Sequence, residues 1–169
     1  MTMTNEEKMR MTIEEGRKSL INKEFPVGAI IFKGDEVISR AHSSGESALE
    51  FLPHAEMAAL LEADKRHYLP PDRKKMQLFT TLEPCMMCLG AAMSFFIGEI
   101  FYALEAPIDG AAAFAVQFLK EERKEIPSYR LPVIHAGLLK AEGQYLLRDY
   151  IKLVPGGPLV EYSKTLISL

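Results

Sequence analysis

The sequence lacks the features that mark secreted and membrane-spanning proteins. Only two of its 169 residues are cysteines, so we expect reduced thiols and a cytoplasmic protein. The first ten residues are polar and charged rather than apolar, which argues against a signal peptide. The longest strongly apolar stretch, 86–97, is far shorter than the ~20 residues that a membrane span requires. We therefore expect no association with a membrane.

An excess of positive charge is also missing. The formal net charge is −3 and the pI is about 5.9. Proteins that bind nucleic acid by electrostatic attraction usually have a basic surface, which this balance does not offer, although a local basic patch stays open. Apolar residues make up 48% of the chain and charged residues 25%, which is typical of a globular protein and argues against disorder, collagen and coiled coil.

Hydrophobic patterns predict an alternation of helices and strands after an initial hairpin. We expect helices over 5–21, 54–66, 86–96, 111–125 and 138–152, and strands over 27–32, 37–39, 76–81, 99–104 and 131–136. This order predicts an α/β fold, a three-layer α/β/α sandwich with a mixed five-stranded sheet. The length suits one domain over residues 1–169, with 153–169 as a C-terminal extension that Pro-Gly-Gly-Pro interrupts.

Two short motifs supply the residue types of a zinc site. His54-Ala55-Glu56 opens one predicted helix, and a Pro-Cys-Met-Met-Cys run that contains Cys85 and Cys88 opens another. Zn²⁺ prefers nitrogen and sulfur ligands in a tetrahedral arrangement, and one imidazole with two thiolates fills three positions. The positive end of a helix dipole also favours thiolates. Because only three strong ligands converge, we expect water in the fourth position, which is typical of a catalytic zinc.

The same motifs predict a hydrolytic deamination. Zinc lowers the pKa of its bound water to about 7, and Glu56, in the same helical turn as the histidine, is placed to take the proton. The zinc-bound hydroxide would attack the amino-bearing carbon of an electron-poor ring, while Glu56 passes protons to the ring nitrogen and the departing ammonia. A redox pair of the two cysteines and a purely structural zinc are the alternatives. The distant His-Ala-Glu and the missing fourth ligand count against them.

A His-x-Glu motif followed by Pro-Cys-x-x-Cys is the signature of zinc deaminases. Beyond it, the stretches PVGAIIF, HAEMAAL, TTLEPCMMCLGAAM and FIGEIFYAL resemble the cytidine and deoxycytidylate deaminase superfamily. Within this superfamily the chain is most similar to the branch of tRNA adenosine deaminases and nucleobase or nucleoside deaminases. The resemblance extends over roughly residues 5–152, where VIHAGLLKAEGQYLLRDYIK matches the last strand and helix. It implies the deaminase fold, a catalytic Zn²⁺ and a homodimer.

The resemblance also suggests which residues border the substrate. Val27 matches the first strand of tRNA-type and cytosine-type members, and Ala55 separates the histidine from the glutamate. Glu83 matches a glutamate of the family that we assign to holding its loop. Ser43 falls where the family commonly has a substrate-binding asparagine, and the neighbouring His42 is expected at the edge of the pocket. Since serine cannot offer the two-sided hydrogen bonding of an amide, this departure changes the expected substrate and leaves the zinc chemistry intact.

Several apolar residues have two possible roles. Phe51, Leu52, Phe114 and Phe118 could line a pocket, although core packing is favoured for each of them. The predicted helix over 86–96 is apolar on nearly every face, which indicates burial in a core or an interface. The C-terminal tail carries Leu159, Val160 and Tyr162, which could reach across a dimer or cover the mouth of a pocket.

Three functions fit these observations. The favoured hypothesis is a zinc-dependent hydrolase that deaminates a small nucleobase, nucleoside or related heteroaromatic amine, because the ligand set is intact and the chain is acidic. The alternative is a tRNA adenosine deaminase that converts adenosine to inosine in an anticodon loop. A catalytically silent partner subunit is the least favoured, because such a subunit usually lacks the glutamate that is present here as Glu56.

Overall fold

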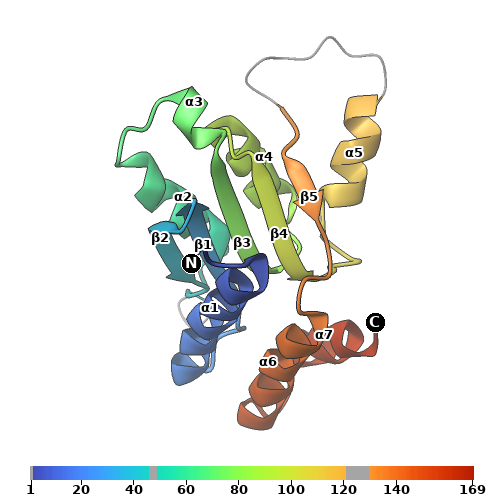
Figure 1. The fold of residues 1–169 in the computed structure, drawn as a ribbon. Helices are drawn as coiled ribbons and strands as arrows, with labels where there is room; N and C mark the ends of the chain where they lie inside the picture. Colours follow the sequence, from blue (N-terminus) through green and yellow to red (C-terminus); the bar gives the residue numbers. More distant parts are fainter. Residues whose placement is uncertain (1, 46–48, 121–129) are drawn as a thin grey trace.

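The computed structural model describes residues 2–45, 49–120 and 130–169. Its centre is one five-stranded sheet with the order β2-β1-β3-β4-β5 (Figure 1). The strand β1 is antiparallel to both of its neighbours, while β3, β4 and β5 run parallel to one another. The strands are β1 (Gly28–Lys33), β2 (Glu36–His42), β3 (Met76–Leu82), β4 (Glu99–Leu104) and β5 (Val133–His135).

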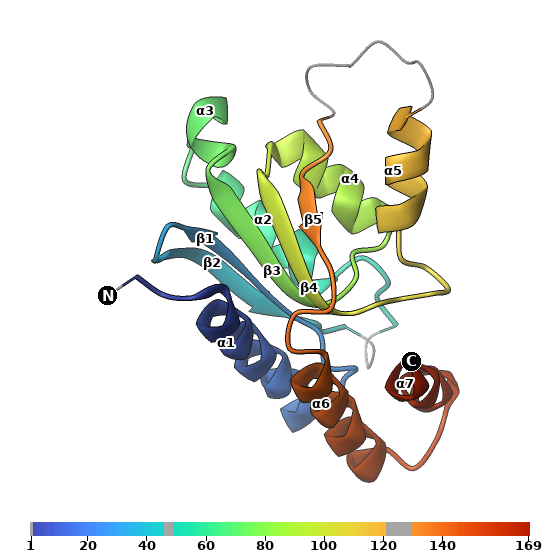
Figure 2. The same ribbon diagram turned by 45° about the vertical axis from the view of Figure 1, so that its right-hand side comes forward.

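Helices cover both faces of this sheet (Figure 2). On one face lie α1 (Asn5–Arg17), which continues into a 3-10 turn, and α6 (Lys140–Leu153). On the other face lie α2 (Ala55–Asp64) and α4 (Met86–Phe95), with α5 (Ala112–Lys120) beside β5. The predicted three-layer α/β/α sandwich with a mixed five-stranded sheet is therefore confirmed.

Two short stretches that contain prolines begin helices. In the C-terminal tail, Pro158 is the first residue of α7 (Pro158–Ser168), which packs against α6. In the segment after α2, two prolines open the four-residue helix α3 (Pro70–Arg73). Proline fits the first turn of a helix because its missing N–H has no partner there. The predicted helix over 111–125 is observed to residue 120, and its remainder lies outside the described residues.

The helix α1 packs unusually close to the sheet, and two glycines permit it. A Cβ atom added to Gly28 would lie 2.3 Å from the backbone nitrogen of Gly16 and 2.3 Å from the Thr12 carbonyl oxygen. Gly16 of α1 and Gly28 at the start of β1 therefore permit this close packing. The sheet itself is lined by stacked aromatic rings, with the centroids of Phe79 and Phe101 4.5 Å apart.

Some apolar side chains do not enter this core. Phe51, Leu52 and Phe114 are 82%, 70% and 54% exposed, so the expectation of core packing is wrong for these three. The side chain of Phe118 lies outside the described residues. Phe51 and Leu52 belong to the described segment that leads into α2, and their side chains lie at the surface. Along α4 only one side is buried, and Met86 at its start is 53% exposed. No helix of the described residues is long and apolar enough to cross a membrane.

Candidate metal centre and active site

The candidate site lies at one edge of the sheet, where β2, β3 and β4 end and β1 begins (Figure 1). The chain leaves β2 through a loop into α2, and it leaves β3 through a short turn into α4. His54 is the N-cap of α2 and Cys85 is the N-cap of α4. Both motifs therefore begin helices that start at the same edge, which is where α/β sheets commonly bind ligands.

The predicted zinc ligands converge. The Sγ atoms of Cys85 and Cys88 are 3.6 Å apart, and Nδ1 of His54 lies 3.7 Å from the first and 3.5 Å from the second. A tetrahedral zinc with bonds of about 2.3 Å to sulfur and 2.0–2.1 Å to nitrogen requires separations of about 3.8 Å between sulfurs and 3.5 Å between sulfur and nitrogen. Because the observed edges match these values, this donor set fits zinc. These three residues form a possible metal-binding group in the described part of the chain.

The three donors are also electrostatically coupled. Hydrogen bonds from Cys88 and from His54 outweigh the desolvation of Cys85 and lower the pKa of its thiol to about 3. The same hydrogen bond to Cys85, together with burial, raises the pKa of Cys88. The pKa of His54 is raised, chiefly by its hydrogen bond with Cys85. A divalent cation bound by these three groups would displace their protons, because metal ligation requires the deprotonated forms.

Glu56 lies beside this cluster and is almost fully buried, with 3% exposure. The hydroxyl of Thr80 on β3 donates a hydrogen bond of 2.9 Å to Oε1 of Glu56. Its other oxygen, Oε2, lies 3.6 Å from Sγ of Cys88. Burial raises the pKa of this carboxyl above its ordinary value. A buried carboxyl with a fixed orientation and a raised pKa is suited to accept and return protons.

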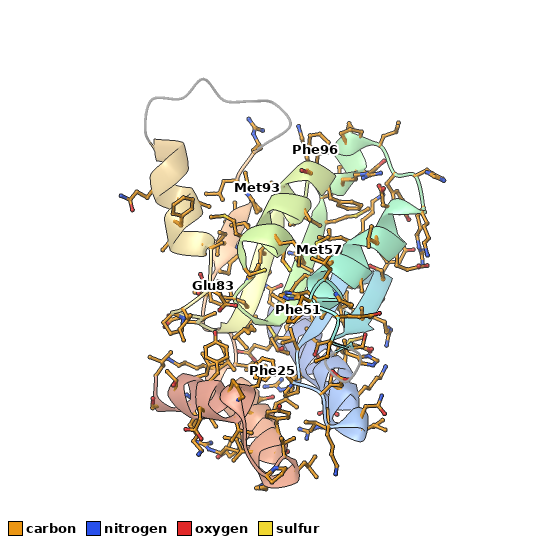
Figure 3. All side chains as sticks on the ribbon, turned by 180° about the vertical axis from the view of Figure 1, so that it is seen from behind. Phe25, Phe51, Met57, Glu83, Met93 and Phe96 are labelled. Carbon is orange, nitrogen blue, oxygen red and sulfur yellow. The ribbon has the colours of Figure 1, made fainter. Side chains whose placement is uncertain are left out.

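A pocket of about 580 Å³ opens in front of the cluster. Its floor includes His54, Glu56 and Cys85, and one wall comes from the loop that precedes α2. The opposite wall comes from α7. Figure 3 shows Glu83, Phe51 and Phe25 between the α2 and α4 layer above and the C-terminal helices below. The remaining lining residues are Phe25, Val27, Ser43, Ser44, Leu49, Glu50, Phe51, Pro53, Ala55, Leu82, Glu83, Asp109, Pro158, Leu159 and Tyr162.

Most of the residues predicted to border the substrate line this pocket, namely Val27, Ser43, Ala55 and Glu83. The hydroxyl of Ser43 is engaged with the backbone, since it donates to the carbonyl oxygen of Phe25 and accepts from the N–H of Val27 at 3.1 Å. His42 is not among the lining residues. It belongs to the last position of β2, and its Nδ1 lies 3.2 Å from the buried Glu15 of α1.

Glu83 stabilises the segment that follows β4 through hydrogen bonds to its backbone. Its two carboxylate oxygens accept hydrogen bonds of 3.0 Å from the N–H groups of Ala106 and Ala112. The turn between Ala106 and Ala112 packs directly against the Glu83 side chain. A Cβ atom on Gly110 would lie 2.4 Å from the Glu83 carboxyl carbon. Gly110 also forms an isolated β-bridge with Cys85, which ties this segment to a metal ligand. Both oxygens of Glu83 are thus occupied in holding the loop.

Sequence reasoning missed four polar or aromatic residues of the pocket: Phe25, Ser44, Glu50 and Asp109. Phe25 precedes β1 in a segment with no motif of its own, and it reaches the pocket because Tyr150 and Tyr162 pack against its ring. Asp109 enters through the turn that Glu83 holds. For the C-terminal tail we left two roles open, and Leu159 and Tyr162 line the pocket within the same chain. Asp109 in the turn and Tyr162 in α7 are 53 residues apart in the sequence, so no local sequence pattern predicts that they meet.

Residues 2–104 match the cytidine and deoxycytidylate deaminase zinc-binding region. A tRNA-specific adenosine deaminase of Streptococcus pyogenes is 33% identical over 144 residues, which are 85% of this chain and 87% of the relative. A tRNA-specific adenosine deaminase of Bacillus subtilis is 34% identical over 116 residues, which are 68% of this chain and 71% of the relative. These sequence relatives agree with the motif in pointing to deaminases.

Solved structures with the same arrangement include a tRNA A34 deaminase, described as an A-to-I editing enzyme at the wobble position of transfer RNA. It is 26% identical, with a TM-score of 0.68, and the alignment covers 82% of this chain and 96% of that one. A guanine deaminase from Nitrosomonas europaea, 24% identical, has a TM-score of 0.67 with 87% and 84% coverage, which shows a shared fold. With its zinc-type donor set and its sequence match, the chain belongs to the cytidine and deoxycytidylate deaminase family of zinc-binding hydrolases.

Proposed function

We propose that this protein hydrolyses the exocyclic amine of an adenine ring, with adenosine in a tRNA anticodon loop as the first candidate substrate. The observation that carries this proposal is the similarity to tRNA-specific adenosine deaminases over 85% of the chain, with the His-Cys-Cys cluster and Glu56 in place. The sequence relatives favour this substrate over a small molecule, because they are tRNA-specific adenosine deaminases. The net reaction adds water, releases ammonia and converts the amine into a carbonyl.

His54, Cys85 and Cys88 would hold the zinc in this reaction. Zinc supplies a Lewis acid that makes a water molecule acidic near neutral pH. Glu56 is the residue we assign to proton transfer, because the Thr80 hydroxyl fixes Oε1 and leaves Oε2 toward the metal ligands. Its carboxylate would take a proton from the attacking water and deliver it to the ring nitrogen. It would then take the proton of the newly formed hydroxyl group and deliver it to the amine, which leaves as ammonia. Burial excludes competing solvent from this carboxylate.

Val27, Ala55 and Leu82 would contact the ring of the substrate, because they line the pocket next to the cluster. We assign Ser43 and Glu83 a positioning role. The Ser43 hydroxyl ties the ends of β1 and β2 together, and Glu83 holds the turn that contains Asp109. His42 would act only through Glu15, away from the substrate.

A second candidate is a free aminated base or nucleoside, and the charge of the pocket favours it. Its lining in the described part of the chain includes Glu50, Glu56, Glu83 and Asp109, but neither lysine nor arginine. Carboxylates accept hydrogen bonds from ring N–H and amino groups, whereas they repel phosphates. A substrate without phosphates would therefore meet less electrostatic opposition at this pocket than an RNA loop.

The deciding experiment is ammonia release by the zinc-loaded protein. The substrates are an adenosine-containing tRNA anticodon stem-loop, adenosine, adenine, guanine, cytosine and cytidine, and Glu56→Gln is the control. Release from the stem-loop, lost in the variant, supports the first candidate. Release from a free base or nucleoside alone supports the second candidate. No release from any compound by protein with one bound zinc per chain contradicts both and favours the silent subunit.

A further inference from the structure

The helix α7 forms a wall of the pocket rather than a loose tail. Its residues Pro158, Leu159 and Tyr162 line the pocket. Its opposite side is anchored, since Val160 and Leu166 are buried in the core. The side chain of Gln144 on α6 also donates a hydrogen bond of 3.1 Å to the carbonyl oxygen of Ile167, near the end of α7. The helix therefore has a defined position beside α6 (Figure 2), from which these three residues line the pocket.

Tyr162 connects this wall to the metal side of the pocket. Its hydroxyl donates a hydrogen bond of 2.8 Å to Oδ1 of Asp109, in the turn that Glu83 holds beside Cys85. Burial and the Asp109 carboxylate both raise the pKa of Tyr162, so its hydroxyl keeps the proton that it donates. Its ring stacks on Phe25, with centroids 6.1 Å apart and an angle of 27° between planes. Two aromatic rings thus face the space in front of the cluster.

The wall formed by the segment before α2 combines apolar residues with Ser44 and Glu50. Leu49 and Phe51 line the pocket and yet are 79% and 82% exposed, so they mark its mouth. A ring bound at the cluster would lie between this loop and α7. A volume of about 580 Å³ is in the range of pockets that enclose small molecules. If the base belongs to a polynucleotide, its flanking nucleotides must leave the pocket between these two walls. Their phosphates would then lie near the carboxylates of Asp109 and Glu50.

We propose that α7, through Tyr162 and Leu159, is a specificity-determining wall that packs against a free base or nucleoside and restricts the entry of a base carried by RNA. This inference rests on the proposed deaminase function, and within that function it favours the second candidate, a free aminated base or nucleoside. The C-terminal helix α7, rather than the zinc cluster, would then determine whether a free or a polymeric substrate is preferred. Tyr162 acts by contact with the substrate ring, and Asp109 positions Tyr162 through its hydrogen bond.

The test compares Tyr162→Ala, Tyr162→Phe and the control Tyr145→Ala in the full-length, zinc-loaded protein. Tyr145 lies on α6 and is 60% exposed outside the pocket lining. We measure kcat and KM for adenosine and for an adenosine-containing RNA stem-loop. Tyr162→Ala should raise the KM for adenosine about tenfold and shift the kcat/KM ratio toward the stem-loop by at least about tenfold, as expected for loss of an aromatic contact. Tyr162→Phe should shift the ratio about threefold, and Tyr145→Ala should leave it unchanged.

Direct binding separates failure of this inference from failure of the proposed function. The Kd values of adenosine and of the stem-loop are measured for the same proteins, with thermal unfolding as a check that each variant is folded. If neither the wild type nor any variant releases ammonia, the proposed function fails. The ratio of the two Kd values still tests whether Tyr162 favours adenosine over the stem-loop. The inference is overturned if Tyr162→Ala leaves the preference between the two probes unchanged, moves it toward adenosine, or binds neither probe.

Discussion

The two sides of the pocket are built in different ways. On the metal side, His54 and Cys85 cap two helices, and Cys88 and Glu56 are buried beneath them. At the mouth, the loop before α2 exposes Phe51 to solvent, and α7 reaches over from the far end of the chain. Rigid elements with paired polar groups fix a geometry, whereas loops and terminal elements can vary without disturbing it. We therefore propose that the metal side carries out the chemistry and that the mouth selects the substrate.

The largest expected effect is loss of the metal. Cys88→Ala removes one of three donors whose separations fit a tetrahedral zinc, so we expect less than one zinc per chain and at least about a hundredfold loss of ammonia release. Metal content after dialysis checks the first effect. The control is Met86→Ala, which shortens an exposed side chain at the start of the same helix. Full zinc content and activity in Cys88→Ala would show that the cluster is not the metal site.

The next effect separates the proton carrier from the ligands. Glu56→Gln keeps the shape of the side chain and its hydrogen bond from Thr80, but the amide cannot accept a proton. We expect kcat to fall about 10²–10⁴-fold while one zinc per chain is retained. Glu62→Gln, an exposed change on the same helix, is the matched control. If Glu56→Gln retained its turnover, a group other than Glu56 would have to transfer the proton.

These two sides also differ in how far the sequence predicts them. The ligands and Glu56 lie within two short motifs, and helix geometry brings the members of each motif together, so local patterns suffice. The mouth depends on contacts between distant segments, such as Tyr162 with Asp109 and Phe25. The tail illustrates the difficulty, because Pro-Gly-Gly-Pro interrupts one helix and Pro158 then begins another. Whether Phe51 is buried or exposed also depends on which layer covers its loop, which apolar character alone does not determine.

Glu83 joins the two sides of the pocket, because it holds the turn that contains Asp109 next to the metal ligand Cys85. Glu83→Ala leaves the N–H groups of Ala106 and Ala112 without their acceptors, and we expect a loss of about 1–3 kcal/mol in the free energy of unfolding. The turn with Asp109 should loosen, so amide hydrogen exchange should increase in 105–111 and in α7. Glu161→Ala, an exposed change on α7, is the control. Unchanged exchange in α7 would mean that the two sides are independent.

The smallest effect on stability is expected at the mouth. Phe51→Ser replaces a side chain that is 82% exposed, so the free energy of unfolding should change by less than about 0.5 kcal/mol. The same ring lines the pocket, and its loss should raise the KM about threefold while kcat stays constant, because binding contacts outside the reacting atoms affect both states equally. Leu61→Ser, exposed on α2 and absent from the pocket lining, is the control. If Phe51→Ser instead lowered kcat with KM unchanged, the mouth would take part in the chemical step, and the division between the two sides would not hold.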